Sequence, residues 1–177
     1  VVEASPDGTL EIATEFARQQ ANFHAIDSGP RRGKGHAVRT GMLRARGEFV
    51  FYMDADLSVP LAEVVAFLAY FEGHPEIDGL LGNRQHARSR ITRRQSRYRE
   101  RLGQIFNRLL HGLGLASLRD TQCGFKAFRR EACGAIFRRQ TLDGFAFDVE
   151  VLLLAGCLVY GIGDLPVEWI NSPESKV

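Results

Sequence analysis

The chain has 177 residues, of which 45% are hydrophobic and 25% charged, a length and composition typical of one globular domain with a substantial core. This composition excludes a disordered or low-complexity protein. The net charge of +2 hides an asymmetry, because residues 84–139 hold 15 of the 23 basic side chains but only three of the 21 acidic ones. A basic segment in an acidic frame indicates an anionic partner at one location.

Cysteine spacing and hydropathy set two further limits. Three cysteines without a CxxC pair indicate neither a disulfide framework nor a zinc site, and favour a reducing compartment. No run of about 18 uncharged apolar residues is present, and the nearest, residues 151–160, is expected to be a buried helix rather than a membrane span. The chain begins within an apparent strand and ends shortly after another, so we expect a fragment truncated at both ends.

Helical and extended patterns alternate along the chain. Apolar side chains at helical spacing predict helices over residues 9–20, 36–46 and from Pro60 onward. The apolar face of the third helix would hold Leu61, Val64, Val65, Leu68 and Phe71. Strands are predicted over residues 22–26, 48–53 and 77–82. This alternation favours an α/β domain with a largely parallel sheet, in which ligands bind at the carboxyl ends of strands.

Two aspartates follow the predicted strand EFVFYM directly. Asp54 and Asp56 are two residues apart in an extended segment, so both carboxylates can point to one side and converge on a hard divalent cation. Mg²⁺ or Mn²⁺ held in this way would bridge phosphate oxygens. The alternative is an acidic turn that caps the next helix, because short acidic turns are common.

The run Gly33-Lys34-Gly35 invites a phosphate-loop interpretation, which the spacing excludes. Only three residues separate Gly29 from Gly33, where a Walker A motif has four, and Gly35 stands where Ser or Thr would bind magnesium. The alternative for this run is a solvated loop that binds no phosphate.

Five segments, in order, carry a resemblance to a known family. They are VVEASPDGT at 1–9, GKGHAVRTGMLRARGEFVFYMDADLS at 33–58, LLGNR at 80–84, RDTQCGFKAFRRE at 119–131 and FAFDVEVLL at 145–153. The chain resembles family-2 glycosyltransferases of the dolichyl-phosphate glucosyl- and mannosyltransferase group, and DTQCGFK with FAFDVE points to the β-glucosyltransferase branch. The resemblance implies one catalytic domain over residues 1–177 with the GT-A fold, a Rossmann-like α/β sandwich with a mostly parallel central sheet whose N-terminal strand is missing.

The resemblance also implies the donor site. Residues expected to bind the nucleotide sugar are Glu3, Lys34, Asp54, Ala55 and Asp56, and the metal ligands are Asp54 and Asp56. The chain departs from the family at its start, where Val2, Glu3 and Ala4 replace most of an Asp-Asp-Gly-Ser turn that contacts the base. Glu3 could still accept a hydrogen bond from the base.

Further acidic residues are expected near the reacting groups. Asp120 lies in the run that resembles the family's active-site loop, and Gly124 would permit close backbone approach. Asp148 and Glu150 lie in a predicted apolar helix, where carboxylates are costly unless paired or used. The residues predicted to take part in catalysis are Asp54, Asp56, Asp120, Asp148 and Glu150. A phosphate acceptor, with a second pKa near ~6, does not need a strong base, so Asp148 and Glu150 could instead orient arginines or the metal site.

Eight arginines fall within residues 84–101. On a helix, four of them form a basic stripe beside an apolar stripe, an arrangement suited to the headgroups of an anionic membrane. The bidentate fork of arginine also matches phosphate, so the acceptor phosphate is expected to bind Arg84, Arg93, Arg94 and Arg97. The alternative for each arginine is a solvated face. Trp169 is expected to pack at a strand.

The sequence as a whole therefore predicts a metal-dependent, inverting transfer of a hexose from UDP-glucose to dolichyl or polyprenyl phosphate at the cytoplasmic face of a membrane. A GDP-mannose-dependent polyprenyl-phosphate mannosyltransferase is the near alternative, and a non-catalytic relative that keeps only the fold is another. An arginine-rich nucleic-acid-binding domain belongs to a different class. It is disfavoured because the acidic remainder of the chain would repel a polyanion, so no nucleic-acid partner is expected.

Overall fold

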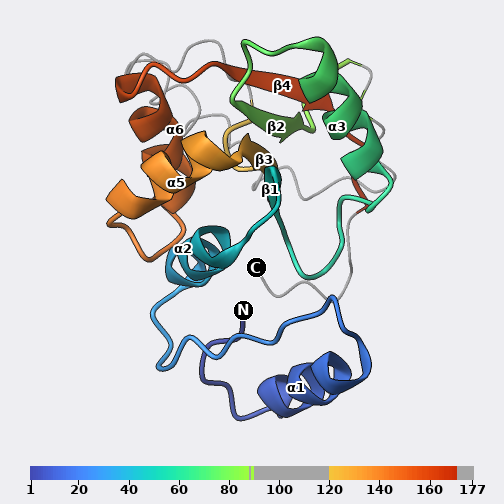
Figure 1. Ribbon diagram of the computed structural model, residues 1–177, viewed down its shortest axis with the longest axis vertical. Helices are drawn as coiled ribbons and strands as arrows, with labels where there is room; N and C mark the ends of the chain where they lie inside the picture. The colour runs from blue at the N-terminus through green and yellow to red at the C-terminus, as the bar shows by residue number, and fades with distance from the viewer. Residues whose placement is uncertain (88, 90–119, 171–177) are drawn as a thin grey trace.

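The computed structural model describes residues 1–87, 89 and 120–170 (Figure 1). Four strands form one sheet in the order β1-β3-β2-β4, with bounds β1 Phe49–Met53, β2 Gly79–Asn83, β3 Phe125–Arg129 and β4 Ile162–Pro166. Five described helices accompany them, namely α1 Thr9–Gln19, α2 Lys34–Arg44, α3 Glu63–Gly73, α5 Arg130–Arg139 and α6 Phe147–Cys157. The predicted α/β class is confirmed.

The sheet is mixed, and this refines the expected parallel arrangement. β1, β2 and β4 run in one direction, while β3 lies between β1 and β2 and is antiparallel to both. Met53 at the end of β1 is therefore opposite Phe125 at the start of β3, and Asn83 at the end of β2 is opposite Pro166 at the end of β4. The start of β3 and the carboxyl ends of the other strands share one edge of the sheet.

Helices cover both faces of the sheet, which explains why β3 is almost wholly buried (Figure 1). One core cluster joins α2, α5 and α6 to the face that carries Val50, Tyr52 and Phe128. The other joins α3 to the opposite face, through Phe125 and Ala127. The two-residue period of a strand thus sends alternate side chains of β1 and β3 into different cores.

The third helix begins later than the sequence indicates. Pro60 lies in a turn, and the helix starts only at Glu63, whose N–H donates to the Pro60 carbonyl at 3.1 Å. Leu61 and Val65 were expected on the apolar face, but their side chains are 61% and 70% exposed. The face that packs on the sheet is instead built by the fully buried Phe67 and Phe71.

Two other elements differ at the N-terminal end of the chain. The strand predicted over residues 22–26 does not form, and the only extended pairing described there is a single parallel bridge between Val2 and Asp27. Helix α2 begins at Lys34, two residues before its predicted start. This shift places the Gly33-Lys34 step at a helix N-terminus. Within the described residues, no helix has the length and apolar character needed to cross a membrane.

Replacement of Phe67 by alanine should destabilise the fold by about 3 to 5 kcal/mol, because it leaves a cavity between α3 and the sheet. Val65→Ala, two residues away in the same helix and largely exposed, should change the free energy of unfolding by less than about 0.5 kcal/mol. Urea denaturation of both variants provides the comparison. Equal losses would contradict this assignment of the buried face.

Candidate active site

Most of the predicted site residues gather at one edge of the sheet. Asp54 follows β1, Arg84 follows β2, the loop from Asp120 to Gly124 precedes β3, and Trp169 follows β4. The antiparallel direction of β3 brings its starting loop to the edge where the other three strands end. This is the edge at which open α/β sheets bind ligands.

Asp54 is fixed from two sides. Its carboxylate forms an ion pair with the Lys34 ammonium, with an N–O distance of 2.6 Å. Its backbone N–H donates to the Gly124 carbonyl at 2.9 Å. The Asp54 side chain is 40% exposed and remains open to a ligand. A Cβ atom on Gly124 would lie 1.9 Å from an Asp54 carboxylate oxygen, so any other residue at that position would displace the Asp54 side chain.

The turn after Asp54 is tight and carries the second aspartate. The Leu57 N–H donates to the Asp54 carbonyl at 3.1 Å, and Leu57 adopts a positive φ of 51°, which is uncommon for a residue with a branched side chain. One carboxylate oxygen of Asp56 accepts the Ser58 N–H at 3.0 Å. Ala55 and Asp56 are exposed.

The residues at this turn fit a magnesium or manganese ion that is shared with a phosphate ligand. No group of three or more His, Cys, Asp or Glu side chains suited to a metal occurs among the residues that the structure describes. Mg²⁺ commonly binds one or two protein carboxylates and takes its remaining ligands from water and substrate phosphates. The accessible carboxylates of Asp54 and Asp56 meet that requirement, with Lys34 as a neighbouring positive charge.

Arg84 and Asp120 form a bidentate ion pair beside this turn. The Arg84 Nε and Nη2 atoms lie 2.7 and 2.8 Å from the two oxygens of Asp120, and the Arg84 backbone N–H adds a third hydrogen bond at 2.9 Å. Asp120 is only 4% exposed. Burial acts to lower the pKa of Arg84, but the hydrogen bonds and charge of Asp120, with smaller effects from Cys123 and Asp54, outweigh it and raise that pKa.

Trp169 completes the setting of Arg84. The guanidinium carbon of Arg84 lies 5.8 Å from the centroid of the Trp169 ring, within cation–π range. Trp169 is 8% exposed and belongs to the α3-side core, as its expected packing role requires. The other predicted acceptor residues, Arg93, Arg94 and Arg97, lie outside the described residues, as does the arginine stripe.

Asp148 and Glu150 contact protein groups. The buried Asp148 carboxylate accepts hydrogen bonds from the Lys126 ammonium and the Tyr52 hydroxyl. Glu150 accepts the backbone N–H groups of residues 141 and 142, both at 2.8 Å, and the Thr141 hydroxyl at 2.6 Å. Both carboxylates are thus engaged by protein groups in this structure, and their predicted part in catalysis stays a prediction.

The loop held by Glu150 packs against the start of α2. The Gln140 side-chain amide donates to the carbonyls of Gly35 and Leu142, both at 2.9 Å, and the His36 N–H donates to the Asp143 carbonyl at 3.2 Å. Glu150 therefore supports the helix N-terminus that presents Lys34 to Asp54.

Glu3 lies on the same helix N-terminus. Its carboxylate accepts the N–H groups of Arg32 and Gly33 at 3.1 and 3.0 Å, and lies 3.2 Å from His36 Nδ1. Burial acts to raise the pKa of Glu3, but these hydrogen bonds and the charge of His36 outweigh it and lower the pKa below its usual value. Glu3 thus satisfies the two backbone N–H groups that directly precede Lys34.

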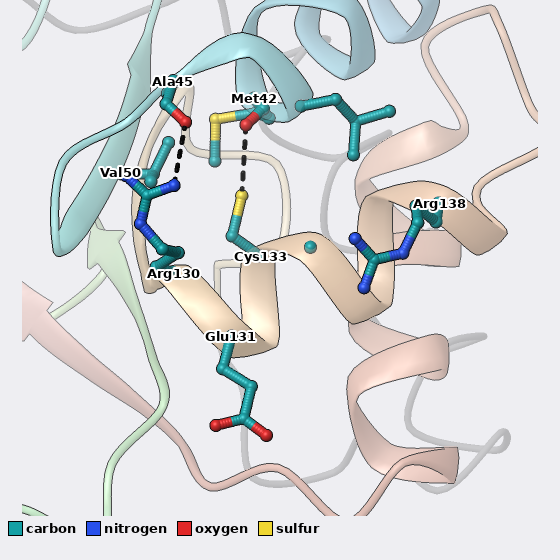
Figure 2. A pocket seen from close by; sticks show the side chains of 9 residues that line it. Met42, Ala45, Val50, Arg130, Glu131, Cys133 and Arg138 are labelled. Atoms are coloured by element: carbon teal, nitrogen blue, oxygen red, sulfur yellow. Dashed lines mark hydrogen bonds between the residues drawn. The ribbon is translucent and has the colours of Figure 1, made fainter.

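A separate pocket of about 300 Å³ lies at the opposite end of β1 (Figure 2). The C-terminal end of α2 and most of the length of α5 flank it, and its lining includes Met42, Val50, Arg130, Cys133 and Arg138. None of the residues predicted for the active site lines this pocket.

Comparison with known proteins decides the family. The family model described as glycosyl transferase family 2 matches residues 1–137. The chain belongs to glycosyl transferase family 2. This membership confirms the predicted enzyme class, a glycosyltransferase.

Curated relatives match the chain over its whole length. A dolichyl-phosphate β-glucosyltransferase of Trichomonas vaginalis is 31% identical over 180 residues, which are 100% of this chain and 53% of that protein. The dolichyl-phosphate β-glucosyltransferase of Mus musculus is 32% identical over 183 residues, which are 100% of this chain and 56% of that protein. The chain thus spans about half the length of the curated relatives it matches.

Solved structures confirm the GT-A type of fold. The glucosyl-3-phosphoglycerate synthase of Mycobacterium tuberculosis, in complex with Mn²⁺, UDP-glucose and phosphoglyceric acid, superposes with a TM-score of 0.65 at 18% identity, covering 97% of this chain and 59% of that chain. A mannosyltransferase of Pyrobaculum calidifontis, in complex with GDP-mannose and Mn²⁺, gives a TM-score of 0.55 at 20% identity, covering 98% and 46%.

Sequence analysis missed the buried partner of Asp148 in this family 2 site. Lys126 sits in the otherwise apolar strand FKAFR, and a lysine at a buried strand position is itself a signal of a paired charge. Its cross-strand neighbour is Tyr52, which the sequence shows only as one residue of the apolar run EFVFYM. The partners could not be assigned without the strand register.

Glu3 yields a pH prediction. Because its folded pKa lies below the ordinary value of 4.5, its stabilising contribution is present above pH 4.5 and disappears as the pH falls through the folded pKa. Glu3→Gln should therefore lower the free energy of unfolding by about 1 to 2 kcal/mol at pH 7 and by progressively less below pH 4.5.

Urea denaturation at a series of pH values measures the difference. The exposed Glu72→Gln variant on α3 provides the control and should show no such pH-dependent gap. A gap for Glu3→Gln that widens on acidification would contradict the assigned contacts.

Proposed function

We propose that the protein containing this chain transfers glucose from UDP-glucose to dolichyl or polyprenyl phosphate, with inversion at the anomeric carbon and with a divalent cation. The observation that carries the proposal is that two features lie at the same edge of the sheet. One is an accessible Asp54 held by Lys34 and Gly124, and the other is the Arg84–Asp120 ion pair. The names of the curated relatives support the sugar and the lipid acceptor.

The donor half of the proposed site lies around Asp54. Mg²⁺ or Mn²⁺, when bound by Asp54 and Asp56, would neutralise charge on the nucleoside diphosphate that leaves. Lys34 adds a fixed positive charge 2.6 Å from Asp54 and stands at the N-terminus of α2, a position that itself favours anions. Donor complexes of the two structural neighbours contain Mn²⁺, which supports the choice of cation.

The acceptor half lies around Arg84. Two of the five N–H donors of its guanidinium group are used by Asp120, so the rest can face a phosphate. Asp120 and Trp169 together hold the guanidinium plane, which reduces the entropy lost when the ligand binds. Arg93, Arg94 and Arg97 are proposed to complete this half.

The proposed reaction needs positioning more than proton transfer. An oxygen of the acceptor phosphate forms a bond to the anomeric carbon as the bond from that carbon to the diphosphate oxygen breaks on the opposite face. A phosphate monoester, with a second pKa near ~6, attacks as an anion, so no proton has to be removed. The protein contacts of Asp148 and Glu150 are consistent with a reaction that uses no carboxylate base.

We further propose that the protein works at a membrane, on its cytoplasmic face. The proposed acceptor is a lipid, and the sequence from residue 90 to 109 has arginines at helical spacing beside an apolar stripe at the same spacing. Both features favour a surface of anionic headgroups.

Asp54→Asn and Asp56→Asn should each lower transfer at least about 100-fold, because each removes a negative charge that the cation requires. The measurement is transfer of labelled sugar to polyprenyl phosphate by the full-length protein, with UDP-glucose or GDP-mannose as donor and with Mg²⁺, Mn²⁺ or EDTA. Glu72→Gln, an exposed carboxylate on α3, should retain normal transfer.

Chelator-sensitive transfer from UDP-glucose would support the proposal, and a preference for GDP-mannose would favour the mannosyltransferase alternative. Transfer that ignored both EDTA and the two substitutions would refute the metal site. Binding of UDP-glucose without any transfer would indicate a non-catalytic relative.

Gly124→Ala tests the packing of the site independently of charge. The added methyl group would lie 1.9 Å from the Asp54 carboxylate, so the aspartate must move, and a displacement of about 1 Å should reduce transfer about 100-fold. Gly73→Ala is the matched control, because no atom lies within 4 Å of its added methyl group. Normal transfer by Gly124→Ala would contradict the described position of Asp54.

A further inference from the structure

A fully buried lysine lies directly behind the active-site edge. The Lys126 side chain has 0% exposure, and its ammonium donates to the Cys123 carbonyl at 2.7 Å and to the Asp148 carboxylate at 2.5 Å. The Tyr52 hydroxyl donates to the same Asp148 oxygen, also at 2.5 Å. This cluster is out of reach of any substrate.

The cluster joins two strands that end at the site, β1 and β3, to helix α6. Tyr52 and Lys126 are opposite each other in the β1–β3 register, two residues before Asp54 and two residues after Gly124. Both side chains face the α6 side of the sheet, where Asp148 meets them in the first turn of α6. The Lys126 ammonium thus ties the backbone just before Gly124 to α6.

Stability alone does not account for a buried ion pair at this place. Desolvation of two charges is costly, and well-packed apolar side chains of similar volume commonly give an equal or more stable protein. The Cys123 carbonyl, in contrast, gains an anchor that an apolar side chain cannot supply. Burial, with the charge of Asp148, raises the pKa of Tyr52 well above its usual value, so its hydroxyl remains a donor across the working pH range.

We propose that Lys126, Asp148 and Tyr52 form a positioning network that holds the Cys123–Gly124 backbone against Asp54. Lys126 fixes the position of the Cys123 carbonyl, and the adjacent Gly124 packs against the Asp54 carboxylate. Asp120, in the same loop, orients Arg84. The catalytic consequence rests on the proposed function, whereas the structural role does not.

Two buried thiols allow the structural role to be measured directly. Cys123 lies in the anchored loop, and Cys133 lies on α5, where its Sγ donates to the Met42 carbonyl at 3.6 Å (Figure 2). Burial raises the pKa of each thiol to about 11, so both should react slowly with an alkylating reagent in the folded protein. The exposed Cys157 is removed by Cys157→Ser in the background.

The test variant combines Lys126→Met with Asp148→Leu in the full-length protein, so that no unpaired charge remains. Its thermal midpoint should stay close to that of the background protein. Iodoacetamide labelling, followed by mass spectrometry, should show Cys123 reacting about tenfold faster while Cys133 changes by less than about twofold. Equal acceleration of both thiols, or of neither, would overturn the proposal.

Transfer is the second readout. The double variant should keep its stability yet lose about tenfold in kcat, because the loop that positions Asp54 and Arg84 is released. If the double variant retained both full transfer and stability, the network would have no effect on catalysis and the proposal would be overturned. If the background protein transfers no sugar at all, the proposed function fails, but the labelling ratio still tests the network.

Tyr52→Phe provides a variant that removes one hydroxyl and should fold even if the double variant does not. It withdraws one of the two donors that fix Asp148, so the ratio of Cys123 to Cys133 labelling should rise at least about twofold. An unchanged ratio in this variant would count against the network.

Discussion

The antiparallel pairing of β1 with β3 is the constraint on which the site depends. It places Met53 opposite Phe125, and the next pair along the edge is Asp54 with Gly124, joined by a hydrogen bond of 2.9 Å. Residues 70 positions apart in the sequence thereby become immediate neighbours. The absence of a side chain at Gly124 then lets the Asp54 carboxylate occupy space that any other residue would fill.

Charge pairs at increasing depth organise the rest of this edge. Lys34–Asp54 is the most accessible pair, Arg84–Asp120 is half-buried, and Lys126–Asp148 is buried. An accessible pair can exchange its partner for a ligand at little cost, whereas a buried pair is difficult to separate. This increase in burial from Lys34–Asp54 to Lys126–Asp148 therefore suits accessible pairs that bind substrate and a buried pair that keeps the backbone in place.

Local sequence patterns predicted the elements and residues whose signals are themselves local. The strand before Asp54, the helix that contains Asp148 and Glu150, and the packing of Trp169 all follow from short runs of residues. Patterns failed where tertiary contacts decide. Leu61 and Val65 fit a helical stripe, but the sheet packs against Phe67 and Phe71 instead.

The partners of the predicted residues were the least accessible to prediction. Nothing local joins Lys126 to Asp148 or Glu150 to the loop that supports Lys34, because both depend on strand register and helix placement. The direction of β3 is equally hidden, since a buried run such as FKAFR has the same pattern in parallel and antiparallel sheets. A resemblance to known motifs supplied the expected roles, but it carried no geometry.

The path of the chain between β2 and β3 has a consequence for how such a domain can diversify. Asn83 ends one strand and Phe125 begins its sheet neighbour, so both ends of the connecting segment are fixed at the active-site edge. The entropy lost on closing a connection with fixed ends grows only logarithmically with its length, so doubling the length costs only about 0.6 kcal/mol. Insertions into this connection can accordingly be accommodated while the Asp54–Gly124 junction and the proposed donor half of the site remain unchanged.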